Sequence, residues 1–180
     1  MSDPGRIAQL LFHVDRRIGI GSGFMPPSLL AWATPRGLAP DHKIEAIAVG
    51  YSAVWAGGQD ASGNAVLYYS TNGGKNWRNA TSRLPDTTNP ITAIAANPGS
   101  QYIYIGTSGG DVWKSSNHGE TFASGGAGLS GNYIYAIAFA HPSMVWIGAA
   151  GPNLKYTDHS TWTDRTTDLG WPAGSLIYAL

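Results

Sequence analysis

The chain has 180 residues, a formal net charge of zero and a sequence pI of about 7.0, so nothing in its charge favours nucleic acid as a partner. It contains no cysteine, which excludes disulfides and thiolate chemistry. Only 12% of the residues are charged and 24 are glycines, a composition that suits a turn-rich all-β protein better than a helical one.

Residues 1–43 are the least regular part of the chain. Three short apolar runs, Ile7–Phe12, Ile18–Ser22 and Leu29–Ala33, are candidate strands, and prolines mark the turns around them. We interpret this region as a degenerate repeat unit, with an irregular arm as the alternative.

From residue 44 onward the chain repeats. The tripeptide Ala46-Ile47-Ala48 returns at residues 93–95 and 136–138, and Ala179-Leu180 begins another copy, with spacings of 47, 43 and 43 residues. A period of this length matches one four-stranded blade of a β-propeller. The expected units are 44–90, 91–133, 134–174 and the start of a further one at 175–180.

An eight-residue turn pattern lies inside this repeat. Ser70-Thr71-Asn72-Gly73-Gly74-Lys75-Asn76-Trp77 returns as Ser115-Ser116-Asn117-His118-Gly119-Glu120-Thr121-Phe122, and a shorter copy without glycine occupies 157–162. Asparagine can accept backbone hydrogen bonds, glycine can take positive φ, and the aromatic residue anchors the next strand. The expected structural residues are Ser70, Asn72, Gly74, Trp77, Ser115, Asn117, Gly119, Phe122, Thr157, Asp158 and Trp162.

This pattern resembles the Asp-box, or BNR repeat, of β-propellers, Ser-x-Asp/Asn-x-Gly-x-x-Trp/Phe between the third and fourth strands of a blade. Sialidases, xyloglucanase-type glycoside hydrolases, sortilin-type receptors and a photosystem II assembly factor carry it. The resemblance implies an all-β fold: a β-propeller, or part of one, built of four-stranded antiparallel blades with Asp-box turns. It does not select a function, because enzymes, receptors and assembly factors share the box.

The expected ring is incomplete, since three units are whole and propellers have about 4–8 blades. The sequence leaves three ways to cover the open blade edges. The chain continues in a longer protein, strand 176–180 joins the N-terminal strands in one composite blade, or several copies close the ring together.

Catalytic signatures are missing from the sequence. A glycosidase needs two carboxylates across the scissile bond, and none of the eleven acids forms a sequence-local pair. The sialidase and xyloglucanase signature elements are also missing, and the five histidines lack metal-ligand spacing. Residues 106–110 match Gly-x-Ser-x-Gly, but a strand rather than a helix is expected to follow. We therefore expect no catalytic residue, cofactor or metal.

The resemblance places the loops between second and third strands, and those between units, on one face, with the Asp-boxes on the other. Loops on a rigid scaffold often carry binding residues. The predicted function is a non-catalytic binding or scaffold module for a protein or glycan, for example in a phage virion or tail. A fragment of a glycoside hydrolase is the alternative. The predicted binding residues are Asp60, Arg83, Asp86, Arg165, Asp168 and Trp171.

No segment of the sequence reaches the roughly 18 apolar residues that span a bilayer. The apolar run near the N-terminus is interrupted by His13 and Asp15, so we expect no signal peptide and no membrane insertion. The expected location is the cytoplasm or a particle assembled there; the alternative is that the sequence is a mature or excised segment.

Overall fold

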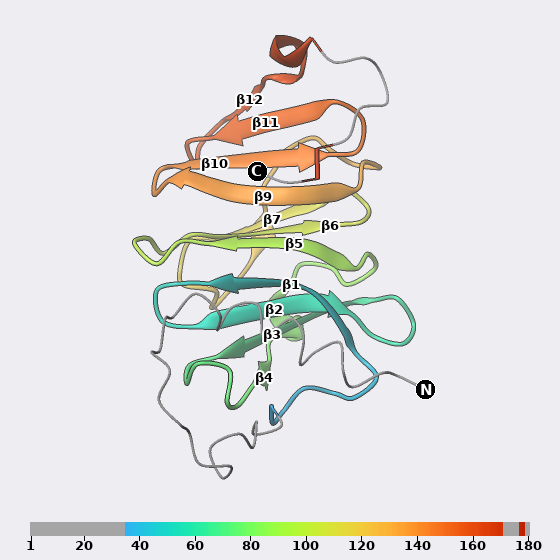
Figure 1. The fold of residues 1–180 in the computed structure, drawn as a ribbon, viewed down its shortest axis with the longest axis vertical. Helices are drawn as coiled ribbons and strands as arrows, with labels where there is room; N and C mark the ends of the chain where they lie inside the picture. Colours follow the sequence, from blue (N-terminus) through green and yellow to red (C-terminus); the bar gives the residue numbers. More distant parts are fainter. Residues whose placement is uncertain (1–34, 171–176, 179–180) are drawn as a thin grey trace, which may run out of the picture.

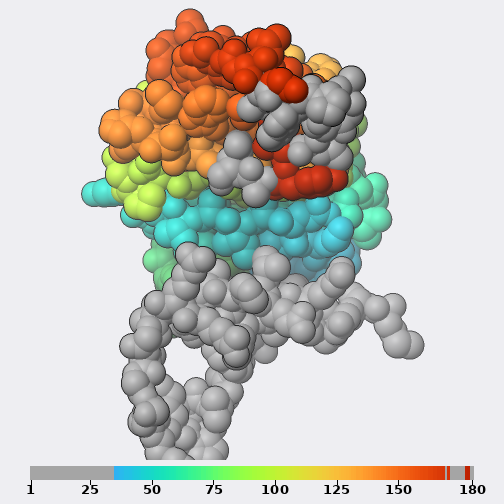
Figure 2. Space-filling view, turned by 45° about the horizontal axis from the view of Figure 1, so that its top comes forward, coloured from blue at the N-terminus to red at the C-terminus, as the bar shows by residue number. Residues whose placement is uncertain are grey.

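The computed structural model describes residues 35–170 and 177–178. Their strands form three four-stranded antiparallel sheets, which follow one another along the longest axis of the molecule (Figure 1). In the space-filling view, the cyan, yellow-green and orange parts of the chain follow one another in the same order (Figure 2). The predicted all-β fold of four-stranded antiparallel sheets is thereby confirmed. The candidate strands before residue 34 and the loop tryptophan Trp171 lie outside the described residues.

Strand order in each sheet follows chain order, so each sheet is a meander. The first sheet contains β1 (Lys43–Val49), β2 (Val54–Gln59), β3 (Ala65–Ser70) and β4 (Arg78–Asn79). The second contains β5 (Ile91–Ala96), β6 (Ile103–Thr107), β7 (Val112–Ser115) and β8 (Ala123–Ser124). The third contains β9 (Ile134–His141), β10 (Met144–Ala149), β11 (Asn153–Thr157) and β12 (Trp162–Asp164). Short 3-10 helices η2 (Thr81–Arg83) and η3 (Thr166–Leu169) follow the first and third sheets. No helix in the described residues is long and apolar enough to cross a membrane.

The sheets pack through a repeated contact between a glycine and an isoleucine. Gly57 of β2 faces Ile91, the first residue of the next sheet, and Gly106 of β6 faces Ile134 in the same way. A Cβ atom on Gly106 would lie 2.5 Å from Ile134 Cγ2. Ile91 and Ile134 are both fully buried. The sheets can approach this closely because these two β-strand positions carry no side chain.

The turn after the third strand, which we call the third-strand turn, is organised by a buried hydroxyl group. In the second sheet, Ser115 Oγ accepts hydrogen bonds from the backbone N–H groups of Gly119 (2.9 Å) and Asn117 (3.3 Å). Asn117 Oδ1 accepts one from Thr121 N–H at 3.1 Å. The first sheet repeats the arrangement, with Ser70 Oγ bonded to Gly74 N–H and Asn72 Oδ1 to Asn76 N–H, both at 2.9 Å. The two turns thus share the same pattern of bonds from backbone N–H groups to serine and asparagine oxygens.

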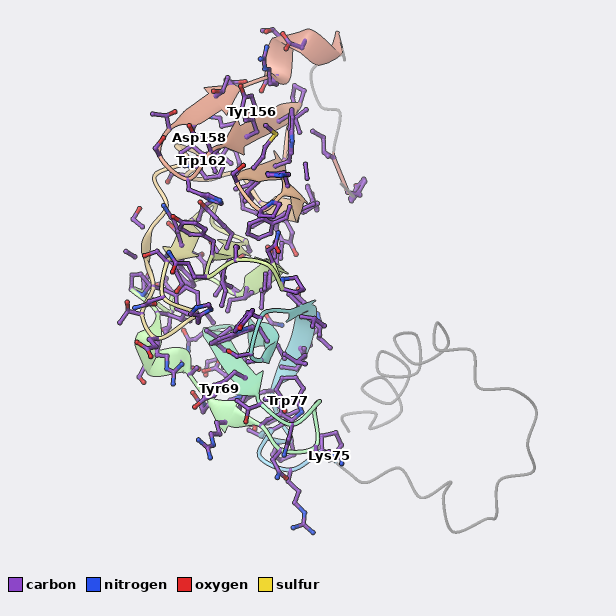
Figure 3. All side chains as sticks on the ribbon, turned by 90° about the vertical axis from the view of Figure 1, so that its left-hand side faces the viewer. Tyr69, Lys75, Trp77, Tyr156, Asp158 and Trp162 are labelled. Carbon is purple, nitrogen blue, oxygen red and sulfur yellow. The ribbon has the colours of Figure 1, made fainter. Side chains whose placement is uncertain are left out.

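The third-strand turn of the third sheet is shorter and depends on a carboxylate. Asp158 Oδ1 accepts hydrogen bonds from Ser160 Oγ at 2.6 Å and from the N–H groups of Ser160 and Thr161, each at 3.0 Å. Figure 3 shows Asp158 and Trp162 at the opposite end of the molecule from Trp77. The hydrogen bond from the Ser160 hydroxyl, followed by those from the two N–H groups, holds the pKa of Asp158 well below its ordinary value of 3.8.

Replacing Gly106 by Ala should destabilise the fold by about 1–3 kcal/mol, because the added methyl group overlaps Ile134. Chemical denaturation measures the change. In the double variant Gly106→Ala/Ile134→Ala the clash is relieved, so its loss should be smaller than the sum of the two single losses. Simple additivity would contradict the proposed contact.

The stability of the fold should depend on pH through the carboxylate of Asp158. Its pKa is depressed in the folded state, so the unfolded state binds the proton first and the stabilisation is lost as pH falls below about 4. Between about pH 5 and pH 2, the Tm of Asp158→Asn should therefore fall less than that of the wild type. Glu120→Gln is the matched control, because the Glu120 carboxylate accepts no hydrogen bond from the described residues. Equal falls for Asp158→Asn and the wild type would refute the role of this carboxylate.

Candidate binding site

The first strands of the three sheets lie side by side and form what we call the inner edge. Each of these strands carries a β-bulge at the same repeat position, which leaves Glu45, Thr92 and Tyr135 without a direct partner in the neighbouring strand. Bulges re-aim side chains and occur frequently beside functional sites. We call these three residues, with Tyr178 at the corresponding position of the next repeat, the bulge row.

Aromatic side chains dominate one end of the bulge row. The ring of Tyr135 lies 4.7 Å from that of Tyr133 and 4.8 Å from that of Tyr178, measured between centroids. Tyr178 is 67% exposed and Tyr135 is half-buried. Burial, with a smaller contribution from the nearby Glu45, raises the pKa of Tyr133 above its ordinary value of 10.0. The three tyrosine rings offer flat apolar faces with hydroxyl groups, which suits a protein or sugar ligand.

The other members of the bulge row are polar and held in place. Thr92 Oγ1 donates a hydrogen bond to the carbonyl oxygen of Ile134 at 2.6 Å, which joins the second sheet to the third. Lys43 Nζ lies 2.7 Å from Glu45 Oε1. Glu45 is the sole carboxylate in β1, β5 and β9, and Lys43 neutralises it.

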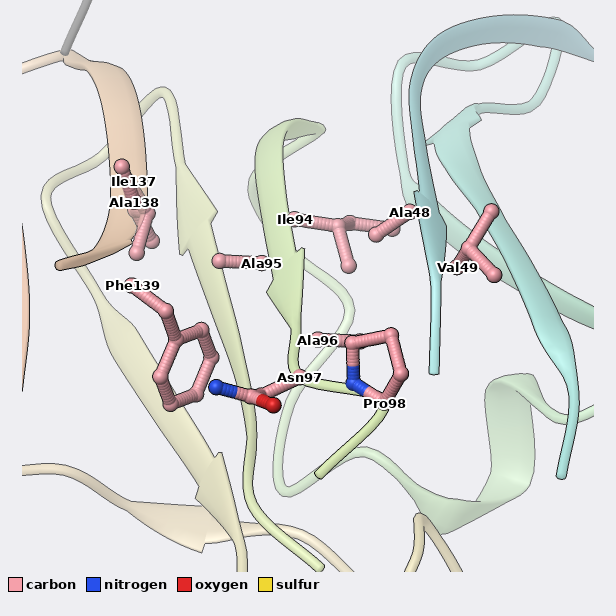
Figure 4. Close-up of a pocket in the computed structure, with 10 residues that line it drawn as sticks. All are labelled: Ala48, Val49, Ile94, Ala95, Ala96, Asn97, Pro98, Ile137, Ala138 and Phe139. Carbon is pink, nitrogen blue, oxygen red and sulfur yellow. The ribbon is translucent and has the colours of Figure 1, made fainter. Parts of the chain in front are cut away.

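A hollow of about 370 Å³ opens at the other end of the inner edge (Figure 4). It is lined by the final residues of β1 and β5, by the middle of β9 and by the turn that follows β5. Its lining side chains are apolar except for the amide of Asn97, but polar atoms make up more than half of the exposed wall. The small alanines of the Ala-Ile-Ala repeat leave this space open. The lining includes Ala48, Val49, Ile94, Ala96, Pro98 and Phe139.

The predicted loop residues Asp60 and Asp86 each stabilise their own loop. Asp60 Oδ1 accepts hydrogen bonds from the N–H groups of Ser62 (2.8 Å) and Asn64 (2.9 Å). Asp86 Oδ1 accepts from Thr88 Oγ1 at 2.8 Å and from the N–H of Thr87 at 2.6 Å. For Asp60 the bonds from Asn64, and for Asp86 the bonds from Thr88, are the main causes that lower the carboxyl pKa. A lowered pKa is the opposite of what a general acid requires.

Of the other predicted binding residues, Arg165 and Asp168 contact each other, whereas Arg83 has different partners. Arg165 Nη1 lies 2.9 Å from Asp168 Oδ2, and the guanidinium group covers the ring of Tyr156. Arg83 stacks on Tyr69 instead, and its Nη1 donates a hydrogen bond to the carbonyl oxygen of Gly119 at 2.9 Å. Their role in binding stays a prediction, as does that of Trp171.

The loops on the predicted binding face contact one another through the backbone. Ser108 N–H bonds the carbonyl oxygen of Pro90 at 3.0 Å, and Gly131 N–H bonds that of Gly109 at 2.7 Å. At the opposite ends of the strands, His118 N–H in a third-strand turn bonds the carbonyl oxygen of Gln101. The loops between second and third strands therefore meet those between units, and the third-strand turns meet the turns between first and second strands.

Sequence reasoning missed the inner edge as a candidate site. Its signal was the Ala-Ile-Ala repeat itself, preceded by Glu45, Thr92, Tyr135 and Tyr178 at one repeat position. The bulge that singles out this position is set by strand pairing and is not visible in the residue order. Within residues 35–170 and 177–178, no group of three or more His, Cys, Asp or Glu side chains is placed to hold a metal ion.

Comparison with known proteins gives structural matches only. No family model matches the chain, and no curated protein matches its sequence. YCF48 from Cyanidioschyzon merolae superposes with a TM-score of 0.55 at 21% identity, over 75% of this chain and 43% of that one. YCF48 bound to D1 peptide gives a TM-score of 0.56 at 14% identity, over 69% and 40%.

The GH74 enzyme of Niastella koreensis also matches, with a TM-score of 0.54 at 22% identity, over 67% of this chain and 22% of that one. The chain therefore spans less than half the length of these structures. Identities this low establish the fold alone. The chain has the all-β blades of a β-propeller, and none of its three sheets is closed on itself.

Proposed function

We propose that the protein is a non-catalytic, Asp-box-type β-propeller module that binds a segment of another protein along its inner edge. The tyrosine group of the bulge row carries this proposal, because it combines an exposed aromatic surface with a rigid sheet beneath it. Exposed tyrosines on a rigid support are favoured at protein interfaces, since they bury a large area at small entropic cost. The hollow at the far end of the same strands, whose lining side chains are mostly apolar, offers a second place for a side chain of the ligand.

Two further observations support a protein ligand. A structural neighbour, YCF48, is described in complex with a peptide of the protein D1. The inner edge also presents one carboxylate paired with one lysine, a neutral combination that does not select a charged polymer. As a setting we propose a larger assembly, such as a phage virion or tail, in which the module acts as a scaffold.

Hydrolysis of a glycan is the second candidate, because a GH74 enzyme shares the fold. A glycosidase requires two carboxylates about 5–10 Å apart across the bond that it cleaves. The inner strands hold Glu45 alone, and the loop carboxylates Asp60 and Asp86 are engaged by their own backbones. The geometry of the described residues therefore favours binding over hydrolysis.

A screen of the full chain against peptide and glycan arrays tests the ligand class. We expect peptide ligands, with affinity then measured by calorimetry. Tyr135→Ala and Tyr178→Ala should each weaken binding about tenfold or more, equivalent to ~1.4 kcal/mol. Tyr51→Ala is the matched control, because Tyr51 is also exposed (71%) but lies in the turn after β1, away from the bulge row, and is not among the residues that line the hollow.

Three outcomes would contradict the proposal. Binding to glycans alone would change the ligand class. Turnover of a β-glucan or sialoside that disappears in Glu45→Gln would establish an enzyme. Peptide binding that survives both tyrosine substitutions but fails in Asp168→Ala would move the site to the loops predicted from sequence.

A further inference from the structure

One face of the first sheet carries a row of large side chains on neighbouring strands. Trp55 of β2 pairs with Tyr69 of β3, and Tyr69 pairs with Arg78 of β4. Directly paired residues of an antiparallel sheet place their side chains on the same face, about 5 Å apart. The rings of Trp55 and Tyr69 stack with 5.5 Å between their centroids. The row therefore leads from a buried tryptophan to an exposed arginine on the edge strand.

A second arginine reaches the same tyrosine from η2. The Cζ atom of Arg83 lies 4.6 Å from the centre of the Tyr69 ring. Its Nη1 donates a hydrogen bond to the carbonyl oxygen of Gly119 in the second sheet at 2.9 Å, which holds the guanidinium group in place. A hydrogen bond from Arg78, and a weaker one from Arg83, lower the pKa of the Tyr69 hydroxyl below its ordinary value of 10.0. Two guanidinium groups thus converge on one phenol oxygen.

We call Arg78 and Arg83 the arginine pair. Within residues 35–170 and 177–178, neither of them forms an ion pair with a carboxylate. Glu120 follows Gly119 in the chain, but it also lies beyond ion-pair distance of Arg83. A guanidinium group has five N–H donors, so the pair keeps donors beyond those that Tyr69 and Gly119 engage. Both the charge and the donors of the pair are therefore open to a ligand.

The third sheet shows the same arrangement with a carboxylate added. Tyr156 occupies the position of Tyr69, and the ring of the half-buried Trp146 lies 5.0 Å from it. The guanidinium group of Arg165 lies 5.5 Å from the centre of the Tyr156 ring and donates a hydrogen bond to its hydroxyl oxygen. Arg165 Nη1 also lies 2.9 Å from Asp168 Oδ2. A guanidinium group that is bound to a tyrosine in this way therefore still holds a carboxylate.

The first sheet has a positive charge where the third sheet has this acid. In both sheets a threonine after the fourth strand, Thr81 or Thr166, accepts a hydrogen bond from the backbone of the third strand. Two residues after this threonine, the first sheet has Arg83 and the third sheet has Asp168. The first sheet therefore supplies a second cation and no carboxylate at this position.

We propose that the arginine pair is a second binding site, separate from the inner edge, for the carboxylate groups of an acidic segment in a partner protein. The planar guanidinium group matches a carboxylate through two parallel hydrogen bonds. Because β4 is the strand farthest from β1 in its sheet, roughly 14 Å away at ordinary strand spacing, the site acts independently of the bulge row.

An NMR titration of the full chain with hexaglutamate, as a peptide with blocked ends, tests the site. We expect the side-chain Nε–H signals of Arg78 and Arg83 to shift, and hexaglutamine to leave them in place. Arg78→Gln should weaken hexaglutamate binding about fivefold, the upper range for one exposed ion pair, and added salt should weaken it further. Arg78 is exposed, so the circular dichroism of this variant should match that of the wild type.

Lys75→Gln is the matched control, because it removes the same charge from an exposed turn of the same sheet. Figure 3 shows Lys75 apart from Tyr69. This variant should weaken binding less than about twofold. Equal weakening by Lys75→Gln and Arg78→Gln would mean that overall charge attracts the peptide, and it would overturn the proposed site.

Tyr135→Ala separates this site from the proposed site on the inner edge. It should leave the affinity for hexaglutamate unchanged, whether or not the inner edge binds peptides. Loss of hexaglutamate binding in Tyr135→Ala would place the peptide at the bulge row and overturn the second site.

Asp168→Asn tests the comparison between the sheets. It removes the carboxylate from Arg165, so hexaglutamate should shift the Nε–H signal of Arg165 in this variant and not in the wild type. An unchanged Arg165 signal in the variant would refute the comparison.

Inorganic phosphate and an oligothymidylate test the ligand class. Tighter binding of either one than of hexaglutamate at the arginine pair would overturn the assignment to carboxylates. Signals of Arg78 and Arg83 that stay in place with hexaglutamate would overturn the site itself.

Discussion

The contact between a strand glycine and the first isoleucine of the next unit governs the arrangement of the sheets. At Gly57, Gly106 and Gly148 the second strand carries no side chain, and a buried isoleucine from the following unit fills the space. The contact fixes how closely consecutive sheets approach and brings the first strands together at the inner edge. Side chains of ordinary size at these glycines would push the sheets apart and remove both features.

The third-strand turns serve the same packing from the outside. Serine and asparagine oxygens in the first two sheets, and the Asp158 carboxylate in the third, bond the turn's own backbone and hold it in one conformation. In this conformation Phe122 and Trp162 contact aromatic residues of the preceding sheet. The turns therefore pack neighbouring sheets together, and this packing accounts for their repeated geometry without a ligand.

The inner edge differs from the rest of the surface because its backbone is irregular at one repeated position. The bulges turn Glu45, Thr92 and Tyr135 out of the strand ladder. Tyrosine at this position, supported by Tyr133 and Tyr178, makes an aromatic surface on an otherwise small-residue strand. The carboxylates of Asp60 and Asp86 hold their own loops, an arrangement that supports the proposed binding function.

The sequence by itself determined the repeat, the strand order and the turns, because each depends on short-range patterns: a period near 43–47 residues, alternating apolar positions, and oxygen-bearing side chains before glycine. It also placed Asp60, Asp86, Arg83, Arg165 and Asp168 in loops. It could not show that Asp60 and Asp86 cap their own loops, nor that Arg83 reaches Gly119, because those bonds depend on loop conformation. The bulge row was likewise decided by the tertiary structure, since strand pairing alone determines which residue of an alternating run loses its partner. The partial exposure of Trp146 depends on how the sheets pack, and no pattern in the sequence indicates it.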